Sequence, residues 1–502
     1  MFYGWNQIAM VYVIFIIAAW QLYPGASMEL STLISIIGGL ALAGIYGLFS
    51  SVYPRSGGEY VFLSRTLLPI IGFVVSFSFA FWQLFYFGLN AAFFGSVGLS
   101  PLFGSIGVLT GNQAALNIGT WFVSAWGQFV SGLIVIGFFT YVMYRGMRWY
   151  FRVQRWAAYV TAGSLLLTVI VLVLAWAGVF NFKANFDAIA GAGAYARVIS
   201  QGAATGVALH PAFSLGQTIN FLLWPAFSLW FAVASTSFSG EVKNVRRGQL
   251  LGIAGAILSM GAVMIALMFL SRHVFGSDFV LASSALPASK FPLAVAPSIL
   301  PMTAIAVNNV VIAVLINLWA IAIAFLIAST TLVYATRAML AWGIDGMGPE
   351  ALANVSEKYH SPTVAIVIGG VIGLFALTIY SFTTLAATLA GFLGFAPAFA
   401  VMSLNAIVFP YLRKDLFERS PIAFRVGGIP LISILGVIGS AFSIFVFYRL
   451  FVDDAYGANK PFTLWLTAGV LVTAIVWFYA ARSYRASKGV DMARRYAEIP
   501  IE

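Results

Sequence analysis

The chain has 502 residues, of which 61% are hydrophobic and only 8% are charged. So few charged side chains cannot cover the surface of a water-soluble globule of this length, and that class of protein is excluded. The formal net charge of +11 is therefore better explained by membrane topology than by nucleic-acid binding, and the absence of cysteine excludes disulfides, thiolate nucleophiles and iron–sulfur ligation.

Apolar runs long enough to cross a membrane as helices recur along the whole chain. Bounding these runs by polar, glycine and proline clusters predicts an all-α integral membrane protein with twelve spans. The predicted spans cover about residues 3–23, 30–52, 68–98, 118–144, 155–180, 214–238, 249–271, 303–336, 362–382, 384–412, 430–450 and 462–481.

The basic residues are distributed unevenly between the two sides of these spans. With the amino terminus inside the cell, all but six of the 26 Lys and Arg residues fall in cytoplasmic connections or in the tail after the last span. The six exceptions are Lys183, Arg197, Arg272, Lys290, Arg449 and Lys460. This bias is typical of proteins of the plasma membrane with cytoplasmic loops rich in positive charge, and it predicts that both termini are cytoplasmic.

The first span begins almost at the first residue and has no basic segment before it, since the first basic residue is Arg55. It therefore does not resemble a cleaved signal peptide. A naturally short terminus and a start codon placed late both remain open interpretations.

The span interiors contain no Asp, Glu, Lys or Arg, which argues against proton-pumping subunits and voltage sensors. They do contain neutral polar side chains, and for any one of these an interhelical hydrogen bond is the simplest role. These residues are Gln83, Asn90, Gln128, Gln217, Asn220, Ser228, Ser235, Thr236, Asn308, Asn309, Asn317, Ser329, Thr330, Thr331, Ser403 and Asn405.

The sixth span is the most unusual, because a hydroxyl-rich stretch over residues 227–240 follows Pro225. Proline removes one helical hydrogen bond, and Ser and Thr compete for the freed backbone groups. The pattern predicts a kinked or locally opened helix. Irregular backbone at membrane depth is tolerated only where protein buries it or where it lines a cavity, so we expect a polar ligand pocket here. A proline kink that serves packing alone is the alternative.

Three stretches resemble the amino acid–polyamine–organocation family of secondary transporters. They are PRSGGEYVF at residues 54–62, SGEVKNVRR at residues 239–247 and ATRAMLAWGIDGMGP at residues 335–349, each at the cytoplasmic end of a predicted span. Their order along the chain makes a chance similarity improbable.

The resemblance implies two inverted five-helix repeats, here residues 1–180 and 214–412, joined by an extracellular connection over 181–213. Two peripheral helices over 413–481 and a basic cytoplasmic tail over 482–502 would follow. It also implies a substrate site midway across the membrane, where helices one and six unwind and their ends face the charged groups of an amino acid.

The resemblance carries candidate substrate-binding residues onto both unwound helices. In helix six they are Phe227 at the place of an aromatic gate, with Ser228, Trp230, Phe231 and Ser235. In helix one they are Tyr12, Val13 and Ile14. Two departures stand out, because Phe231 replaces a usual glycine, and residues 5–23 lack the glycine-rich break of the family.

The coupling ion is expected to be Na⁺ or H⁺. The fifth span has no lysine near the cation position of some family members, whereas the hydroxyls of Ser329, Thr330 and Thr331 could bind Na⁺. Helix packing is the simpler role for each hydroxyl. The carboxylates of Glu59 and Glu241 are expected to hold loops by pairing with Arg65 or Lys243.

The sequence thus predicts a secondary transporter of amino acids or related amines that works by alternating access. An accessory membrane subunit that keeps the fold without transporting is the alternative, favoured by the departure in helix one. An enzyme is not expected, because the spans hold no carboxylate pair, no His–carboxylate set and no metal-ligand cluster. The expected partners are a small substrate and the lipid bilayer, with no cofactor, metal or nucleic acid.

Overall fold

The computed structural model describes residues 1–8, 12–385 and 392–497, and these are almost entirely helical. The helices of the first part of the chain are α1 (Phe2–Gln7), α2 (Tyr12–Ala19), α3 (Met28–Val52), α4 (Glu59–Thr66), α5 (Pro69–Phe93), α6 (Ser100–Thr110), α7 (Gln113–Val123), α8 (Ala125–Tyr144), α9 (Met147–Trp176), α10 (Phe182–Ala190) and α11 (Ala194–Ala203). Those of the second part are α12 (Leu215–Phe221), α13 (Leu223–Leu229), α14 (Val245–Phe275), α15 (Ser277–Ala285), α16 (Ile299–Val307), α17 (Val310–Ile344), α18 (Thr363–Phe382), α19 (Phe392–Leu412), α20 (Lys414–Arg419), α21 (Leu431–Val452), α22 (Pro461–Ser487) and α23 (Met492–Ala497).

Short irregular elements connect these helices. The 3-10 turns are η1 (Trp20–Leu22), η3 (Trp230–Ser237), η4 (Ser239–Glu241), η5 (Ala288–Lys290), η6 (Glu350–Ala353) and η8 (Asp454–Tyr456), and η2 (Phe94–Leu99) is a π-helical turn. A small hairpin pairs β1 (Arg425–Val426) with β2 (Ile429–Pro430) in antiparallel register. Its turn is made by Gly427 and Gly428, both at positive φ, a conformation that glycine adopts without steric cost.

Within the described residues, eleven helical segments are long and apolar enough to cross a membrane. They correspond to the second to twelfth predicted spans, although the start of the tenth, at residues 386–391, lies outside the described part. The longest joins α5, η2 and α6 into 42 residues. The first predicted span is represented by α1 and by a short apolar helix over Tyr12–Leu22.

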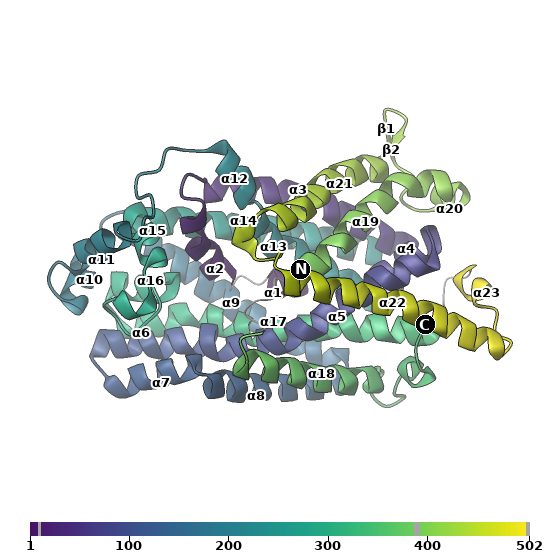
Figure 1. Ribbon diagram of the computed structural model, residues 1–502, viewed down its shortest axis with the longest axis horizontal. Coiled ribbons are helices and arrows are strands. Elements are labelled where there is room, and N and C mark those ends of the chain that lie inside the picture. Colours follow the sequence, from purple (N-terminus) through teal and green to yellow (C-terminus); the bar gives the residue numbers. More distant parts are fainter. Residues whose placement is uncertain (9–11, 386–391, 498–502) are drawn as a thin grey trace.

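The long helices lie side by side along the longest axis of the molecule (Figure 1). Van der Waals contacts and hydrogen bonds between helices hold this packing together, and small residues bring some helices close together. A Cβ added at Gly88 of α5 would come within 2.4 Å of the carbonyl oxygen of Gly373 in α18, so only glycine allows this approach. Helices α10, α11, α15 and α16 gather at one end of the bundle, and α4, α20 and α23 gather at the other.

The sixth span is broken, as the sequence predicts. Helix α12 ends at Phe221, α13 contains Pro225, and the α-helical geometry gives way to the 3-10 turn η3 at Trp230. Figure 1 draws α1 and α13 near the centre of the view, and most of the residues of α13 are buried. The end of α1 meets α13 there, where Ser228 bonds to Ile8, and the candidate site lies beside this contact.

Candidate functional site

A side-chain hydrogen bond joins the first and the sixth span, at the end of α1 and in α13. The hydroxyl of Ser228, in α13, donates a hydrogen bond to the carbonyl oxygen of Ile8, the C-cap residue of α1. Both residues are buried. Because the last carbonyls of a helix have no partner within it, this bond satisfies one acceptor at the end of α1 and fixes the distance between the two elements.

The other hydroxyls of the sixth span mostly hold η3 in place. The hydroxyl of Ser235 donates to Oε1 of Gln249 in α14 at 2.9 Å, and that of Thr236 donates to the carbonyl oxygen of Val233 at 2.9 Å. The indole of Trp230 donates to the carbonyl oxygen of Ser35 in α3 at 3.0 Å. These contacts anchor the 3-10 turn to its neighbours, so its backbone is supported without regular α-helical bonds.

A small cavity lies where α1, α2, α5, α13, η3, α17 and α19 meet. The space within it that the centre of a water molecule can occupy is about 20 Å³, which is close to the minimum that holds one water. Its walls are Gln7, Tyr12, Gln83, Tyr86, Asn90, Phe227, Phe231, Ile327, Thr331 and Phe395. We call this space the inner cavity.

The polar wall of the inner cavity is made of amides that are not fully hydrogen-bonded. Oε1 of Gln7 and Nε2 of Gln83 are buried and have no hydrogen-bond partner among the described residues. The hydroxyl of Tyr12 donates to Oδ1 of Asn90 at 3.2 Å. A buried polar atom without a partner costs about 1–3 kcal/mol, so wall residues that carry such atoms indicate a place for a polar ligand.

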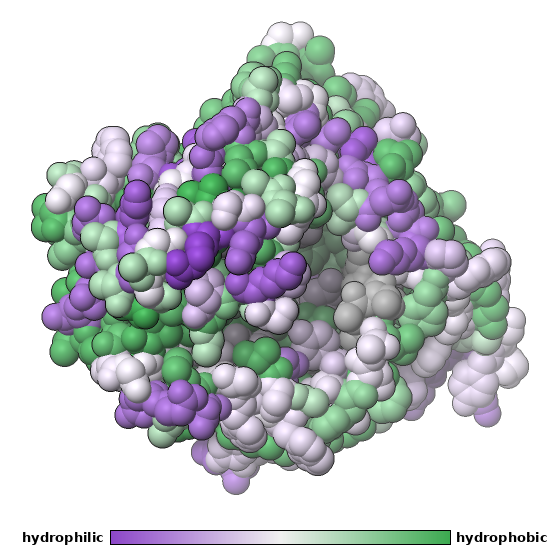
Figure 2. Space-filling view, turned by 60° about the vertical axis from the view of Figure 1, so that its left-hand side comes forward, coloured by the Kyte–Doolittle hydropathy of each residue, from purple (hydrophilic) through white to green (hydrophobic). Residues whose placement is uncertain are grey.

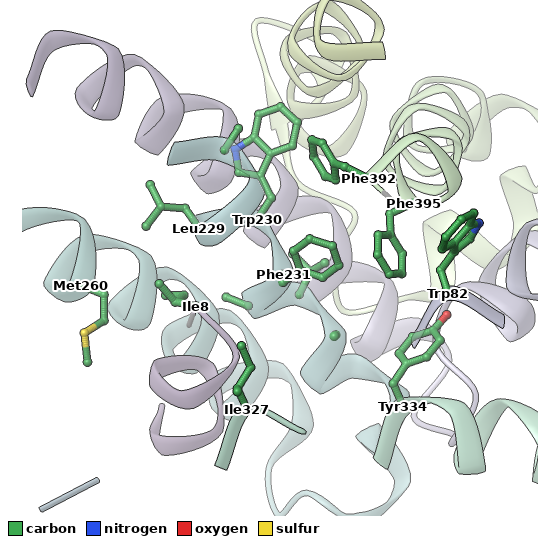
Figure 3. Close-up of a cluster of buried hydrophobic side chains, with 14 of the residues drawn as sticks. Ile8, Trp82, Leu229, Trp230, Phe231, Met260, Ile327, Tyr334, Phe392 and Phe395 are labelled. Carbon is green, nitrogen blue, oxygen red and sulfur yellow. The ribbon is translucent and has the colours of Figure 1, made fainter. Parts of the chain in front are cut away.

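The opposite wall is aromatic. The ring of Phe231 meets that of Phe395 edge-on with centroids 4.8 Å apart, and the ring of Phe227 lies 5.2 Å from Tyr12 and 5.5 Å from Phe231. Figure 3 shows Phe231 directed toward Phe392 and Phe395, whereas the neighbouring Trp230 extends in a different direction from the same turn. The rings leave little free volume beside the amides.

A second, outer cavity of about 140 Å³ adjoins the first. Its walls are Tyr86, Leu223, Trp224, Phe227, Phe392, Leu450 and Tyr456. The rings of Tyr86 and Phe227 belong to both cavities, with their centroids 6.2 Å apart. Figure 2 looks toward the end of the molecule that carries α10 and α11, and this face is hollowed near its centre.

Of the predicted substrate-binding residues, Tyr12, Phe227 and Phe231 line the inner cavity. Ser228, Trp230 and Ser235 make the structural bonds described above. Val13 is buried and Ile14 is half-buried, and neither is among the residues that line this cavity.

The three hydroxyls proposed for sodium lie on different faces of α17. Thr331 lines the inner cavity, whereas the hydroxyl of Ser329 faces that of Tyr150 in α9 at 3.5 Å. The carbonyl oxygen of Thr330 accepts a hydrogen bond from the hydroxyl of Tyr3 at 3.0 Å. Each of the three hydroxyls donates to a carbonyl one turn earlier in the helix.

The candidates chosen from the sequence omit part of the cavity wall. The omitted residues are Gln7, Gln83, Tyr86, Asn90, Ile327 and Phe395. Gln83 and Asn90 belong to the neutral polar residues of the predicted spans, and they lie seven residues, or two helical turns, apart in α5. That spacing places them on one face of the helix, which is the signal that could have singled them out.

The expected loop pairings of Glu59 and Glu241 are wrong. Arg65 forms a buried, two-pronged ion pair with Asp345 instead, with N–O distances of 2.7 and 2.8 Å. Glu241 pairs with Arg337 of α17 at 3.1 Å, and Glu59 accepts a hydrogen bond from Tyr334 at 2.6 Å. These three contacts join α4 and η4 to α17 or its C-cap, at the end of the bundle that carries α4, α20 and α23 (the α4 end). They form because the fold places the last part of α17 beside both α4 and η4.

Comparison with known proteins yields a family match over nearly the whole chain. The family model described as "Amino acid permease" matches residues 5–477. No curated protein matches the sequence. The matched region contains every residue that lines the two cavities.

Proposed function

Because this chain belongs to the amino acid permeases of the amino acid–polyamine–organocation family, we propose that it is a secondary active transporter working by alternating access. Membership in the family indicates a membrane transporter of amino acids or related substances rather than an enzyme. The non-transporting alternative has no support in the family match. The mechanism, the substrate class and the coupling are proposed here.

The observation that carries the proposal is the inner cavity with its unpaired amides. The atoms Oε1 of Gln7 and Nε2 of Gln83 offer an acceptor and a donor at the junction of the two irregular helices. Helix α1 ends beside this junction and α2 begins there. A helix carries partial negative charge at its carboxyl end and partial positive charge at its amino end, so these ends suit an ammonium and a carboxylate respectively.

The wall of the cavity also limits the side chain of the substrate. None of its ten described wall residues is acidic or basic, and four are phenylalanine or isoleucine. A charged substrate side chain would lose hydration here without gaining a counter-charge. We therefore expect amino acids or amines whose side chain is uncharged, and small because the free volume is small.

The shared rings of Tyr86 and Phe227 would act as the gate between the two cavities. In the proposed cycle a substrate enters the outer cavity and passes into the inner cavity when the two rings separate. It is then released at the α4 end when the contacts between α4, α17 and η4 break. Both predicted termini and the basic tail lie on the cytoplasmic side in this scheme, in the plasma membrane, as the charge distribution predicts.

Uptake into proteoliposomes tests the function. We expect purified protein to accumulate small neutral amino acids when an ion gradient is imposed, and to do so less for acidic or basic ones. Correctly folded protein that neither takes up nor exchanges any amino acid or amine would refute the proposal. Replacing external Na⁺ by choline at fixed pH identifies the ion, and unchanged uptake would dismiss a sodium role for Ser329, Thr330 and Thr331.

A further inference from the structure

A carboxyl group at the start of α4 is buried without a counter-charge. The side chain of Glu59 is 0% exposed. Its Oε2 accepts the hydrogen bond from the hydroxyl of Tyr334, and its Oε1 has no partner with good hydrogen-bond geometry among the described residues. The hydroxyl of Tyr46 lies near the same carboxyl group. Two phenols are thus the polar neighbours that α3 and α17 provide.

The basic side chains of α4 and α17 are engaged elsewhere. Arg337 is paired with Glu241, and Arg65 is paired with Asp345. Helices α5 and α19, which pack against α4, contain no acidic or basic residue. The titratable and charged side chains around α4 are Tyr3 of α1, Tyr46 of α3, Tyr53 just after α3, Arg55 in the turn before α4, Tyr60 and Arg65 of α4 itself, Tyr334 and Arg337 of α17, Asp345 at its C-cap, Arg413 just after α19, Glu241 of η4 and Tyr496 of α23.

Burial of this kind favours the protonated carboxyl. Removal from water raises the pKa of Glu59 above its ordinary value, and interactions with the hydroxyl of Tyr334, with the backbone amide of Glu59 and with the hydroxyl of Tyr46 oppose part of that rise. A carboxylate that pairs with no cation among the described residues would be costly in such a place. The neutral acid, in contrast, needs only the partners that are present.

The burial of Glu59 depends on contacts of α4 and the preceding turn with α17 and η3. The turn before it is bonded to η3, since the amide of Gly57 donates to the carbonyl oxygen of Ser237 at 2.8 Å and Ser56 pairs with Phe238. Tyr334, which reaches Glu59, belongs to α17. Separation of α4, α17 and η3 would admit water to the carboxyl group.

The same contacts reach the inner cavity. The ring of Tyr334 lies 4.5 Å from that of Phe79, which in turn lies 4.9 Å from Phe395 and 6.1 Å from Phe231. The last two rings are walls of the cavity. Figure 3 shows Tyr334 near Phe395, on the same side of the cluster. A short chain of packed rings therefore joins Glu59 to the ligand site.

We propose that Glu59 is a proton-binding site whose occupancy is linked to closure of the α4 end of the transporter. The inference rests on the alternating-access function proposed above. The carboxylate takes a proton from water as α4, α17 and η3 close over it, and returns the proton to water when they separate. Closing therefore binds one proton, so low pH at this end favours the closed state and high pH favours opening.

The absence of cysteine allows a direct test of this linkage. A single reporter, Ser237→Cys, places a thiol at a fully buried position in η3, beside the turn that precedes Glu59. The variant Ser487→Cys, at an exposed position of α22, corrects for the pH dependence of the thiol reaction itself. The labelling rates of both are measured in detergent micelles over a pH series.

We expect the rate for Ser237→Cys, divided by that for Ser487→Cys, to rise with pH by up to about tenfold per pH unit, the limit for one linked proton. Adding Glu59→Gln, which mimics the protonated group, should remove that rise. The matched control Glu418→Gln, at an exposed carboxylate, should leave it unchanged. A rise that persists with Glu59→Gln, or no rise in the parent, would overturn the proposal.

A second variant, Tyr334→Phe, tests the same proposal if Glu59→Gln does not fold. Tyr334→Phe removes the hydrogen bond that stabilises the carboxylate, so the pKa of Glu59 in the closed state should rise further. The rise in labelling rate should then continue to a higher pH before it levels off, and a rise that levels off at the same or a lower pH than in the parent would contradict the proposal. The labelling requires no substrate, so its outcome is separate from that of the uptake experiment.

Discussion

Gln83 illustrates how one side chain gives the inner cavity its polarity. It lies in α5, in the middle of an apolar helix, and is 1% exposed. Its Nε2 has no hydrogen-bond partner among the described residues, although aromatic rings line much of the adjoining cavity. A buried amide group of this kind is destabilising unless a ligand or water completes its hydrogen bonds, and we therefore propose that Gln83 binds the substrate.

We predict that Gln83→Met, which keeps the length of the side chain but removes its polar atoms, lowers substrate affinity. The loss of one hydrogen bond of about 1–2 kcal/mol corresponds to roughly a 5- to 30-fold weaker uptake at low substrate concentration. The matched control is Gln113→Met, at an exposed position of α7. Equal uptake by the two variants would show that Gln83 does not bind the substrate.

Phe231 limits the size of the substrate in the same cavity. Truncation by Phe231→Ala should create space beside Phe395, and each additional methylene that a substrate buries there contributes about 0.8 kcal/mol. Two methylenes then improve binding somewhat more than tenfold. Competition of uptake by amino acids of increasing side-chain length measures this. The exposed Phe375→Ala on α18 should leave the order of competitors unchanged, and an unchanged order for Phe231→Ala would refute the assignment.

The sequence identifies the types of residue that form the site, but it does not show in which direction each side chain points. Gln83 and Asn90 are recognisable as polar residues in an apolar span, and Phe227 and Phe231 were placed by the family resemblance. Ser228 and Ser235 are equally polar, yet their hydroxyls bond to Ile8 and Gln249. Whether a polar side chain faces a cavity or a neighbouring helix depends on tertiary packing, which the periodicity of one helix does not contain.

At the scale of elements, α4 and α17 are joined by the buried pair of Arg65 and Asp345. Both side chains are only 3% exposed. The guanidinium group also lies over the rings of Tyr60 and Tyr496, at 5.7 and 5.1 Å from their centroids. The last ring belongs to α23, so a single cation holds three elements at the α4 end.

Removing one member of this pair should be costly, because the other charge is left buried and unpaired. We predict that Arg65→Gln or Asp345→Asn lowers the free energy of unfolding by about 3–5 kcal/mol. Denaturation in mixed micelles measures the change. The control Glu418→Gln breaks the exposed pair with Arg425 and should cost at most about 1 kcal/mol. Similar losses in both cases would contradict the structural role given to the buried pair.

The break in the sixth span could be predicted because proline and hydroxyl residues oppose regular helix locally. The end of α1 at Gln7 could not, since residues 5–23 contain neither glycine nor proline. There the bond from Ser228 to Ile8 and the packing of α1 against η3 and α14 define the helix end. Such contacts join residues more than 200 positions apart, and no local pattern reports them.

At the scale of the whole molecule, the orientation in the membrane is predicted from charge rather than from packing. Helices α10 and α11 lie at one end of the bundle, within the connection predicted to be extracellular. The tail after α22 follows the last span, on the side predicted to be cytoplasmic. Attraction of basic loops to the inner leaflet and their resistance to translocation favour this orientation.

Single cysteines test that orientation in intact cells. We predict that a membrane-impermeant maleimide labels Ser200→Cys, at an exposed position of α11, and does not label Ser487→Cys until the cells are permeabilised. The parent chain should give no signal, because it has no cysteine. Labelling of Ser487→Cys alone before permeabilisation would mean that the molecule is inserted the other way round.

The two rings shared by the inner and outer cavities have a consequence for inhibition. A molecule with an amino acid head and a long apolar tail would place its head among the amides and leave its tail against Trp224 and Leu450, beyond Phe227 and Tyr86. The tail would then hold the rings of Tyr86 and Phe227 apart. The transporter could not close the passage between the two cavities and could not change to the conformation that releases the bound molecule. We expect such compounds to block uptake of short substrates competitively while never crossing the membrane themselves.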